Sequence, residues 1–331
     1  MKPFSFSSPS SVGEALALLA EHDDARLMAG GLDLIHEMKQ GIRSPSIVVH
    51  LARVQELEGI TANREGMEIG ARTTVRELES DPLVREHAPL LAEAAKEIAT
   101  PQLRVMGTVA GNVLQRPQCW YYRDPDSFCL RKGGQHCHAV AGDNRYHAIL
   151  GGGPCHIVCP SDLAPALLAL GASAVVRGPG DDERIIPLSQ LFVGPRVDPH
   201  NEHVLRRDEI ISCFAIPSSA GRSQVFLKAR ERTAWDFALA SVSAVVDLAP
   251  DLVVRRASLV LGGVAPNPWD AAEAAQALVG ATLDDAAIQR AAEASVRDAR
   301  PLRANAYKVD LTRRLVVSAL QRVLGGKGPA K

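Results

Sequence analysis

The sequence predicts an α+β protein with two domains, and three observations support this prediction. The length of 331 residues exceeds that of one average domain. Strands and helices alternate through the first two thirds of the chain, whereas in the last third strands precede helices. A Pro-Ser-Ser-Ala-Gly segment at 217–221 has the composition of a linker. We therefore expect a first domain at residues 1–218 and a second at residues 219–331.

The first domain begins with a β–glycine turn–α–β pattern. Ser11 and Glu14 have the spacing of a capping box, and the Ala and Leu residues that follow predict a helix over 11–22. A strand at 26–28 then leads through a glycine segment into a helix that ends near Gly41. The other expected strands lie at 46–51, 67–71, 173–177, 184–187 and 208–216, and the other expected helices begin at Val75 and Pro89.

The second domain is expected to be a sheet covered by helices. Strands are predicted at 223–229, 239–248 and 254–263, and helices at 269–279, 284–297 and 308–324.

Composition excludes several functional classes. The formal net charge is −1 and aromatic residues make up 4%, which argues against a nucleic-acid-binding surface. No run of about 18 uncharged apolar residues predicts a membrane span. The N-terminus lacks the pattern of a signal peptide, so we expect a cytoplasmic protein, or a periplasmic one if a partner subunit is exported with it.

Two glycine segments are candidate phosphate-binding loops. Ala29-Gly30-Gly31-Leu32-Asp33 lies between a strand and a helix, where backbone N–H groups can approach an anion. Gly107-Thr108-Val109-Ala110-Gly111-Asn112 supplies a second such approach. Neither spacing is that of a Walker A or G-x-G-x-x-G loop, and each alone is compatible with a tight turn without a ligand. Together they favour a dinucleotide bound between them.

Five of the six cysteines fall within one segment, at 115–160, with spacings C-x9-C-x7-C-x17-C-x3-C. Such local clustering favours a metal site over disulfides, and thiolates favour an iron–sulfur cluster or zinc. The segment shows little periodicity, so we expect it to fold around something other than an apolar core. Zinc held by mixed Cys and His remains an alternative, since four histidines lie in the same segment, namely His136, His138, His147 and His156.

Several motifs in order along the chain resemble the xanthine dehydrogenase / CO dehydrogenase flavoprotein family. They are Leu27–Leu34 with Met38-Lys39-x-Gly41, Ile69-Gly70-Ala71-x-Thr73-Thr74, Gly107-Thr108-x-x-Gly111-Asn112, Phe192-x-Gly194-Pro195, Asp208-Glu209-Ile210-Ile211, and Gly262-Gly263-Val264-Ala265-Pro266-x-Pro268. The resemblance implies a two-lobed FAD-binding domain of the PCMH type. It also implies a second domain like the CO dehydrogenase flavoprotein C-terminal domain, an antiparallel sheet with helices.

The resemblance also implies a set of FAD-binding residues. The family usually has Thr where this chain has Leu32, so one hydroxyl donor to the phosphates is absent. The residues implied to bind FAD are Met28, Ala29, Gly30, Gly31, Leu32, Asp33, Leu34, Thr100, Gly107, Thr108, Gly111, Asn112, Asp162 and Lys228.

The cysteine-rich segment resembles the insertion in FAD subunits of periplasmic-type aldehyde oxidoreductases, which holds a [4Fe–4S] cluster. We expect Cys119, Cys129, Cys137 and Cys155 to be the ligands. Cys159 is expected to be a buried free thiol, and Cys213 a core residue of a strand. The histidines are expected near the ligands or at the surface. Four aromatic residues are expected to shield the cluster: Trp120, Tyr121, Tyr122 and Phe128.

By this resemblance the chain is an electron-transferring oxidoreductase subunit. It would pass electrons from a large molybdopterin-binding subunit and a small [2Fe–2S] subunit, through FAD, to an external acceptor. Two alternatives stay open: a stand-alone flavoprotein with a structural zinc in the insertion, and a non-catalytic protein that has lost FAD, for which Leu32 is the argument.

Overall fold

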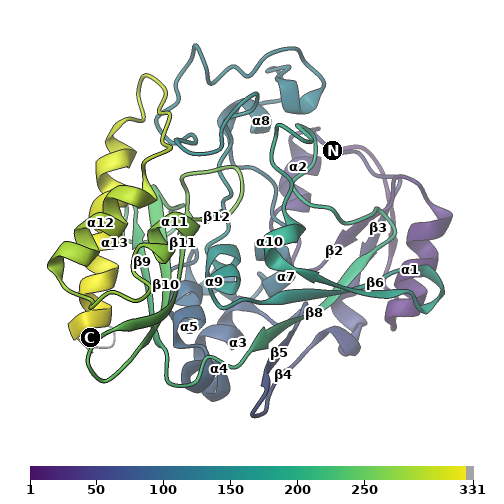
Figure 1. Ribbon diagram of the computed structural model, residues 1–331. Coiled ribbons are helices and arrows are strands. Elements are labelled where there is room, and N and C mark those ends of the chain that lie inside the picture. Colours follow the sequence, from purple (N-terminus) through teal and green to yellow (C-terminus); the bar gives the residue numbers. More distant parts are fainter. Residues whose placement is uncertain (326–331) are drawn as a thin grey trace.

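The computed structural model describes residues 1–325, which form three sheets with helices packed against them (Figure 1). Two sheets belong to the first domain and one to the second, so the α+β fold class is confirmed. The cysteine-rich insertion runs across the top of Figure 1, above the first domain and the second.

The N-terminal lobe is a small parallel sheet in the order β1-β3-β2. Its central strand carries three successive buried residues, which a parallel strand covered on both faces requires. The predicted β–glycine turn–α–β unit is confirmed. The elements are β1 (Ser5–Ser7), α1 (Val12–Glu21), β2 (Arg26–Met28), α2 (Leu34–Lys39), β3 (Ile47–His50), and the 3-10 turns η1 (Leu51–Arg53) and η2 (Gln55–Leu57).

The capping box predicted at the start of α1 is only half formed. The Ser11 hydroxyl accepts a hydrogen bond from the Glu14 N–H at 3.2 Å, as expected. The Glu14 carboxylate, however, accepts from the N–H and hydroxyl of Ser10, at 2.7 and 3.0 Å. A complete capping box occurs instead at α3, between Thr74 and Glu77.

The second lobe is a five-stranded antiparallel sheet in the order β4-β5-β8-β6-β7, and its core contains most of the first domain's buried apolar residues. The strands are β4 (Ile60–Ala62), β5 (Gly66–Gly70), β6 (Ser173–Arg177), β7 (Glu183–Pro187) and β8 (Ile210–Pro217). The helices are α3 (Val75–Ser80), α4 (Pro82–His87), α5 (Pro89–Lys96), α6 (Pro101–Arg104), α7 (Val109–Val113), α9 (Leu163–Ala169), η4 (Pro179–Asp181) and α10 (Leu188–Leu191).

The second domain is an antiparallel sheet in the order β12-β11-β10-β9, covered by three helices. The helix predicted from residue 269 starts later, because Trp269 and Asp270 pair with the edge of β11. The elements are β9 (Ser223–Ala229), β10 (Ala240–Leu248), β11 (Val254–Gly262), β12 (Trp269–Asp270), α11 (Ala272–Gln276), α12 (Asp285–Ser295) and α13 (Tyr307–Gly325).

The insertion leaves and re-enters the first domain at one point. Asn112, before it, accepts hydrogen bonds from the Ser161 hydroxyl at 2.7 Å and the Leu163 N–H at 3.3 Å. Its regular elements are short, α8 (Trp120–Arg123) and η3 (Leu130–Lys132). Contrary to expectation, part of it joins an apolar core, since Ile149 and Leu150 are buried in the core of the second domain.

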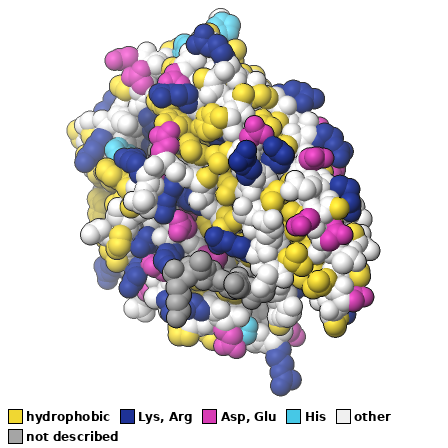
Figure 2. Space-filling model, turned by 90° about the vertical axis from the view of Figure 1, so that its left-hand side faces the viewer, with side chains coloured by type: hydrophobic (Ala, Val, Ile, Leu, Met, Phe, Trp, Pro, Cys, Tyr) yellow, Lys and Arg dark blue, Asp and Glu magenta, His cyan; other side chains and the backbone are white. Residues whose placement is uncertain are grey.

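No helix among residues 1–325 has the length and apolar character needed to cross a membrane. On the face that carries α12 and α13, basic and acidic side chains are both dispersed among apolar and neutral groups (Figure 2).

Candidate functional site

A cavity of about 1390 Å³ opens between the two lobes of the first domain, and the glycine segments and the loop before β8 form part of its wall. All of the residues implied to bind FAD line it except Thr100 and Lys228. Thr100 instead caps α6, where its hydroxyl accepts from the Leu103 N–H at 3.4 Å. Twelve of the fourteen residues implied by the resemblance therefore line a single cavity.

The two glycine segments lie against each other, as the sequence suggested. A Cβ atom on Gly30 would lie 1.8 Å from the Met106 carbonyl oxygen, so only glycine fits there. Gly31 has a φ of +72°, which also favours glycine. Leu32 is 43% exposed and lines the cavity. Its side chain lies at the junction, because a Cβ on Gly107 would be 3.5 Å from Leu32 Cδ1.

The polar residues of the second glycine segment organise its backbone. The Thr108 hydroxyl caps α7 by accepting from the Gly111 N–H at 3.1 Å. Asn112 holds the two ends of the insertion together, so its amide oxygen is already engaged. Most N–H groups of this segment are engaged as well, because those of Gly107, Val109, Ala110, Gly111 and Asn112 all donate to other groups of the protein.

A buried ion pair lies at the inner wall. Lys228 Nζ is 2.6 Å from Asp162 Oδ2 and 3.1 Å from the Glu97 carbonyl oxygen. Burial raises the pKa of Asp162, and the neighbouring Lys228 ammonium opposes that rise. The pair places a fixed carboxylate and ammonium beside the cavity, with Asp162 the member that lines it.

Sequence reasoning missed two segments that complete the cavity. One follows α10 and contributes Val193, His203 and Leu205, and the other is the β9–β10 loop, which contributes Trp235 and Phe237. The first segment carried a signal, because the Phe192-x-Gly194-Pro195 motif lies in it. The second carried none, since exposed loop residues have no periodicity.

Asp33 contacts the insertion as well as lining the cavity. Its carboxylate accepts from the Arg116 N–H at 2.7 Å, from Gln118 Nε2 at 3.3 Å and from Arg123 Nη2 at 2.6 Å. The acid of the first glycine segment therefore fixes the start of the insertion.

Four cysteines of the insertion line one small pocket, and they are the four predicted ligands, Cys119, Cys129, Cys137 and Cys155. All are free thiols. In residues 1–325, no three His, Cys, Asp or Glu side chains approach one another closely enough to hold a single metal ion.

Burial and mutual contact perturb these thiols. Burial raises the pKa of Cys119 to about 11. The Cys155 side chain hydrogen-bonds Cys137, which lowers the pKa of the Cys137 thiol and raises that of Cys155. A soft cation bound between them would stabilise the thiolate form of all four.

The groups around the pocket match the expectations in part. His147 Nε2 lies 3.3 Å from Cys119 Sγ, so this histidine touches a predicted ligand. Tyr121 and Tyr122 line the pocket, and the Trp120 ring packs on that of His147 at 5.5 Å. The prediction for Phe128 is wrong, because its side chain is 68% exposed.

The two remaining cysteines differ from each other. Cys159 is buried in the apolar core of the first domain, as predicted, and its backbone N–H donates to the Ala265 carbonyl at 2.8 Å. Cys213 was predicted to be a core residue but is only half-buried on β8. Burial raises the pKa of the Cys159 thiol to about 12, which keeps it protonated.

Comparison with known proteins identifies the family. The FAD binding domain in molybdopterin dehydrogenase matches residues 2–219, and the CO dehydrogenase flavoprotein C-terminal domain matches residues 225–323. The chain belongs to the family of FAD-binding subunits of molybdopterin dehydrogenases. The family resemblance that the motifs indicated is thereby confirmed, and with it the assignment as an oxidoreductase subunit.

Two named members of the family align with this chain over almost their whole length. The aldehyde oxidoreductase FAD-binding subunit PaoB of Escherichia coli is 32% identical, with 97% of this chain and 98% of that protein covered. The carbon monoxide dehydrogenase medium chain of Hydrogenophaga pseudoflava is 30% identical over 96% of both. A solved structure of the carbon monoxide dehydrogenase of that organism superposes with a TM-score of 0.78 at 28% identity, over 99% of this chain and 100% of that one.

Proposed function

We propose that this chain is the FAD- and [4Fe–4S]-binding electron-transfer subunit of a molybdenum hydroxylase of the aldehyde oxidoreductase type. Its partners would be a large molybdopterin-binding subunit and a small [2Fe–2S] subunit, and its electrons would leave to an external acceptor. The single observation that carries the cluster assignment is the convergence of Cys119, Cys129, Cys137 and Cys155 on one pocket.

The cavity fits FAD. Its glycine segments approach so closely that no side chain fits at Gly30, and the backbone N–H groups of the first segment would be the donors to a bound pyrophosphate. Farther along the cavity wall, His203 Nδ1 is buried without a hydrogen-bond partner in the protein, and a bound cofactor would supply one. Asp162, held by Lys228, would accept a hydrogen bond from a ribityl or ribose hydroxyl.

The insertion fits an iron–sulfur cluster better than zinc. A tetrahedral zinc needs four ligand atoms within about 2.3 Å of one point, and the pocket does not bring even three that close. The four thiols instead line one small pocket together with His147, Tyr121 and Tyr122. A [4Fe–4S] cluster held there supplies a one-electron carrier.

The protein's own residues then bind, orient and exclude water. Tyr122 and Ile157 bury one side of the cysteine pocket, which favours a low local dielectric around bound thiolates. His147 approaches Cys119 Sγ, where an N–H would stabilise a thiolate. The FAD cavity and the cysteine pocket are connected by the segment from Gln115 to Cys119, which lines both at its two ends.

Analysis of the purified chain tests the proposal. Flavin absorbance, iron and acid-labile sulfide are expected, with iron and sulfide in equal amounts and zinc absent. Zinc without iron would favour the stand-alone flavoprotein, and a chain that takes up no flavin in a titration would favour the non-catalytic alternative. Co-purification of a molybdopterin-binding chain and a [2Fe–2S] chain tests the partners.

Cysteine variants test the ligand set. Each of Cys119→Ser, Cys129→Ser, Cys137→Ser and Cys155→Ser is expected to lose iron. Cys213→Ser is the matched control, because this thiol lies on β8 outside the pocket and iron should be retained. Loss of iron in Cys159→Ala with retention in Cys155→Ala would replace Cys155 by Cys159 in the set.

A further inference from the structure

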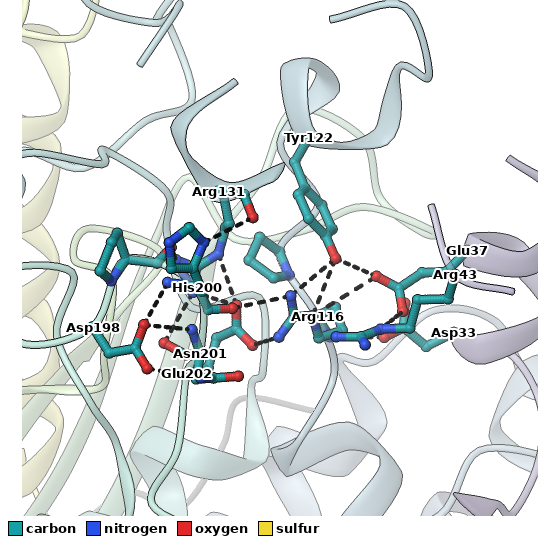
Figure 3. Close-up of polar contacts among 12 residues, drawn as sticks. Asp33, Glu37, Arg43, Arg116, Tyr122, Arg131, Asp198, His200, Asn201 and Glu202 are labelled. Carbon is teal, nitrogen blue, oxygen red and sulfur yellow. Dashed lines mark hydrogen bonds and ion pairs between the residues drawn. The ribbon is translucent and has the colours of Figure 1, made fainter. Parts of the chain in front are cut away.

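A buried network of charged side chains joins the cysteine pocket to the first glycine segment of the FAD cavity (Figure 3). We call it the Glu202 network. Its members come from α2, from the insertion and from the loop before β8, and none of their side chains is more than 14% exposed. They are Glu37, Arg116, Tyr122, Arg131 and Glu202.

One half of the network reaches the cysteines. Arg131 follows Cys129 by two residues and its side chain is 2% exposed. Its Nε lies 2.8 Å from Glu202 Oε1, and its Nη2 donates to the Asn201 carbonyl at 3.1 Å. Glu202 also accepts from Arg116 through its other oxygen. Glu202 thus bridges an arginine beside a cluster ligand and an arginine beside the FAD cavity.

The other half reaches the FAD loop. Arg116 Nε and Nη2 each donate to the Tyr122 hydroxyl at 3.1 Å, and that hydroxyl donates to Glu37 Oε1 at 2.5 Å. Glu37 is 2% exposed and lies on α2, immediately after the glycine segment. In Figure 3 the Tyr122 hydroxyl points between Arg116 and Glu37.

Asp33 adds a second connection between the same two sites. Its carboxylate accepts hydrogen bonds from the Arg116 N–H at 2.7 Å and from the Arg123 guanidinium at 2.6 Å. The backbone between these two residues contains Cys119, a predicted ligand. Any displacement of the insertion therefore acts on both Asp33 and α2.

The electrostatics make this network sensitive to its geometry. Burial raises the pKa of Glu202, while Arg116 and Arg131 oppose that rise. Burial acts against the charge of Arg116, but Glu202, Tyr122 and Glu37 hold its pKa above the ordinary value. A buried charge that loses its partner is strongly unfavourable, so a shift of the insertion that separates these partners is costly.

We propose that Glu202 and Arg116 are positioning residues that couple the two cofactor sites, so that a cluster on the cysteines strengthens FAD binding and FAD strengthens retention of the cluster. The segment 116–131 has little regular structure, so a cluster bound by Cys119 and Cys129 fixes it. The network transmits that order to α2 and the glycine segment. Coupling of this kind acts equally in both directions. The inference rests on the proposed function, because it requires a cluster in the insertion.

Flavin titration of cluster-loaded and cluster-free chains tests the coupling. Cys129→Ser is expected to weaken FAD binding about tenfold, within the usual range for coupled sites. Glu202→Gln, loaded with its cluster, should weaken FAD by a similar factor. In the Glu202→Gln background, Cys129→Ser should cause no further loss. In the reverse direction, removal of FAD should speed loss of iron to a chelator in the wild-type chain and not in Glu202→Gln.

The matched control is Glu79→Gln. Glu79 also lies between two arginines, Arg76 at 3.2 Å and Arg104 at 3.0 Å, and it is 14% exposed against 12% for Glu202. It does not contact the insertion, so the tenfold effect of Cys129→Ser should persist in this background. If Cys129→Ser does not fold, removal of iron from the wild-type chain with a chelator gives the same comparison.

The outcomes separate the two proposals. A chain that binds both cofactors with independent affinities overturns the coupling and leaves the proposed function intact. Additive effects of Glu202→Gln and Cys129→Ser would also overturn it, because they would mean that the network does not carry the coupling. A chain that takes up no iron overturns the proposed function, and the coupling with it.

Discussion

The two halves of the cysteine insertion are held in different ways. The first half, residues 116–131, is attached to the first domain by charged side chains, through Asp33, Glu37 and Glu202. The second half, residues 144–159, is attached to the second domain by backbone hydrogen bonds and apolar burial. Ile149 and Leu150 donate to the Val264 carbonyl at 2.9 and 3.0 Å and enter its core.

A buried lysine strengthens the second attachment. Lys308 on α13 is fully buried, and its ammonium donates to the carbonyls of Tyr146 and His147, each at 3.2 Å, and of Gly263 at 2.5 Å. Asn305 adds a hydrogen bond to the His147 carbonyl at 3.0 Å. Because the predicted ligands come from both halves, the cysteine pocket is supported by charged contacts with the first domain and by backbone and apolar contacts with the second.

The largest effect is expected from breaking the apolar attachment. Leu150→Ala should lower the free energy of unfolding by about 3.5 kcal/mol, because it leaves a cavity in the second domain's core. Chemical denaturation measures this loss, and it should not depend on salt. Val140→Ala, at a residue that is 54% exposed in the insertion, serves as the control and should change stability by less than about 0.5 kcal/mol. Equal effects would remove the distinction between core and surface positions.

The next largest effect is expected for Lys308→Met, which should lower the free energy of unfolding by about 2.5 kcal/mol. The substitution keeps the volume but removes the ammonium donor from the Tyr146 and Gly263 carbonyls and leaves the His147 carbonyl with Asn305 alone. The second half of the insertion should then exchange its amide hydrogens faster, while the first half keeps its protection. Uniform loss of protection across both halves would contradict separate attachments.

Acid should lower the free energy of unfolding through His203, which lies near Arg116 of the charged attachment. His203 is half-buried near Arg116 and Arg43, and desolvation followed by these two charges lowers its pKa from 6.5 to about 4. The unfolded chain therefore binds more protons between these values, so stability falls as pH drops through this window. The expected loss between pH 7 and pH 5 is about 2 kcal/mol. His203→Gln should remove this part of the pH dependence, as measured by denaturation at each pH.

The smallest effect is expected from one hydroxyl of the Glu202 network. Tyr122→Phe removes the hydroxyl that bridges Arg116 and Glu37, leaving their direct 3.7 Å contact, and should cost about 1 kcal/mol, with weaker FAD binding in the same protein. Tyr121→Phe is the matched control, since its hydroxyl donates to the Asp143 carbonyl at the surface. A flavin titration in which both variants behave alike would show that the buried hydroxyl has no special role.

The sequence predicted the regular elements of both domains correctly where the spacing of apolar residues carries the information. The strands β6, β9 and β10 and the long helix α13 follow from apolar periodicity. Where spatial neighbours determine a residue's exposure or secondary structure, the sequence-based prediction failed. Phe128 is exposed, Cys213 is half-buried, and Trp269 pairs with β11 rather than starting a helix. Each outcome depends on what lies beside the residue in space.

By itself, the sequence determined the order of the two domains, the glycine segments of the FAD cavity and the four cysteines that meet at one pocket. Glycine permits close backbone approach and cysteine side chains favour soft metals, so both residue types can be interpreted from the sequence alone. Only the tertiary structure decided that Glu202 pairs with Arg116 and Arg131, and that Lys308 supports the insertion. These partners lie 86, 71 and about 160 residues apart. Loop charges follow no period, so burial and proximity in the folded chain select their partners.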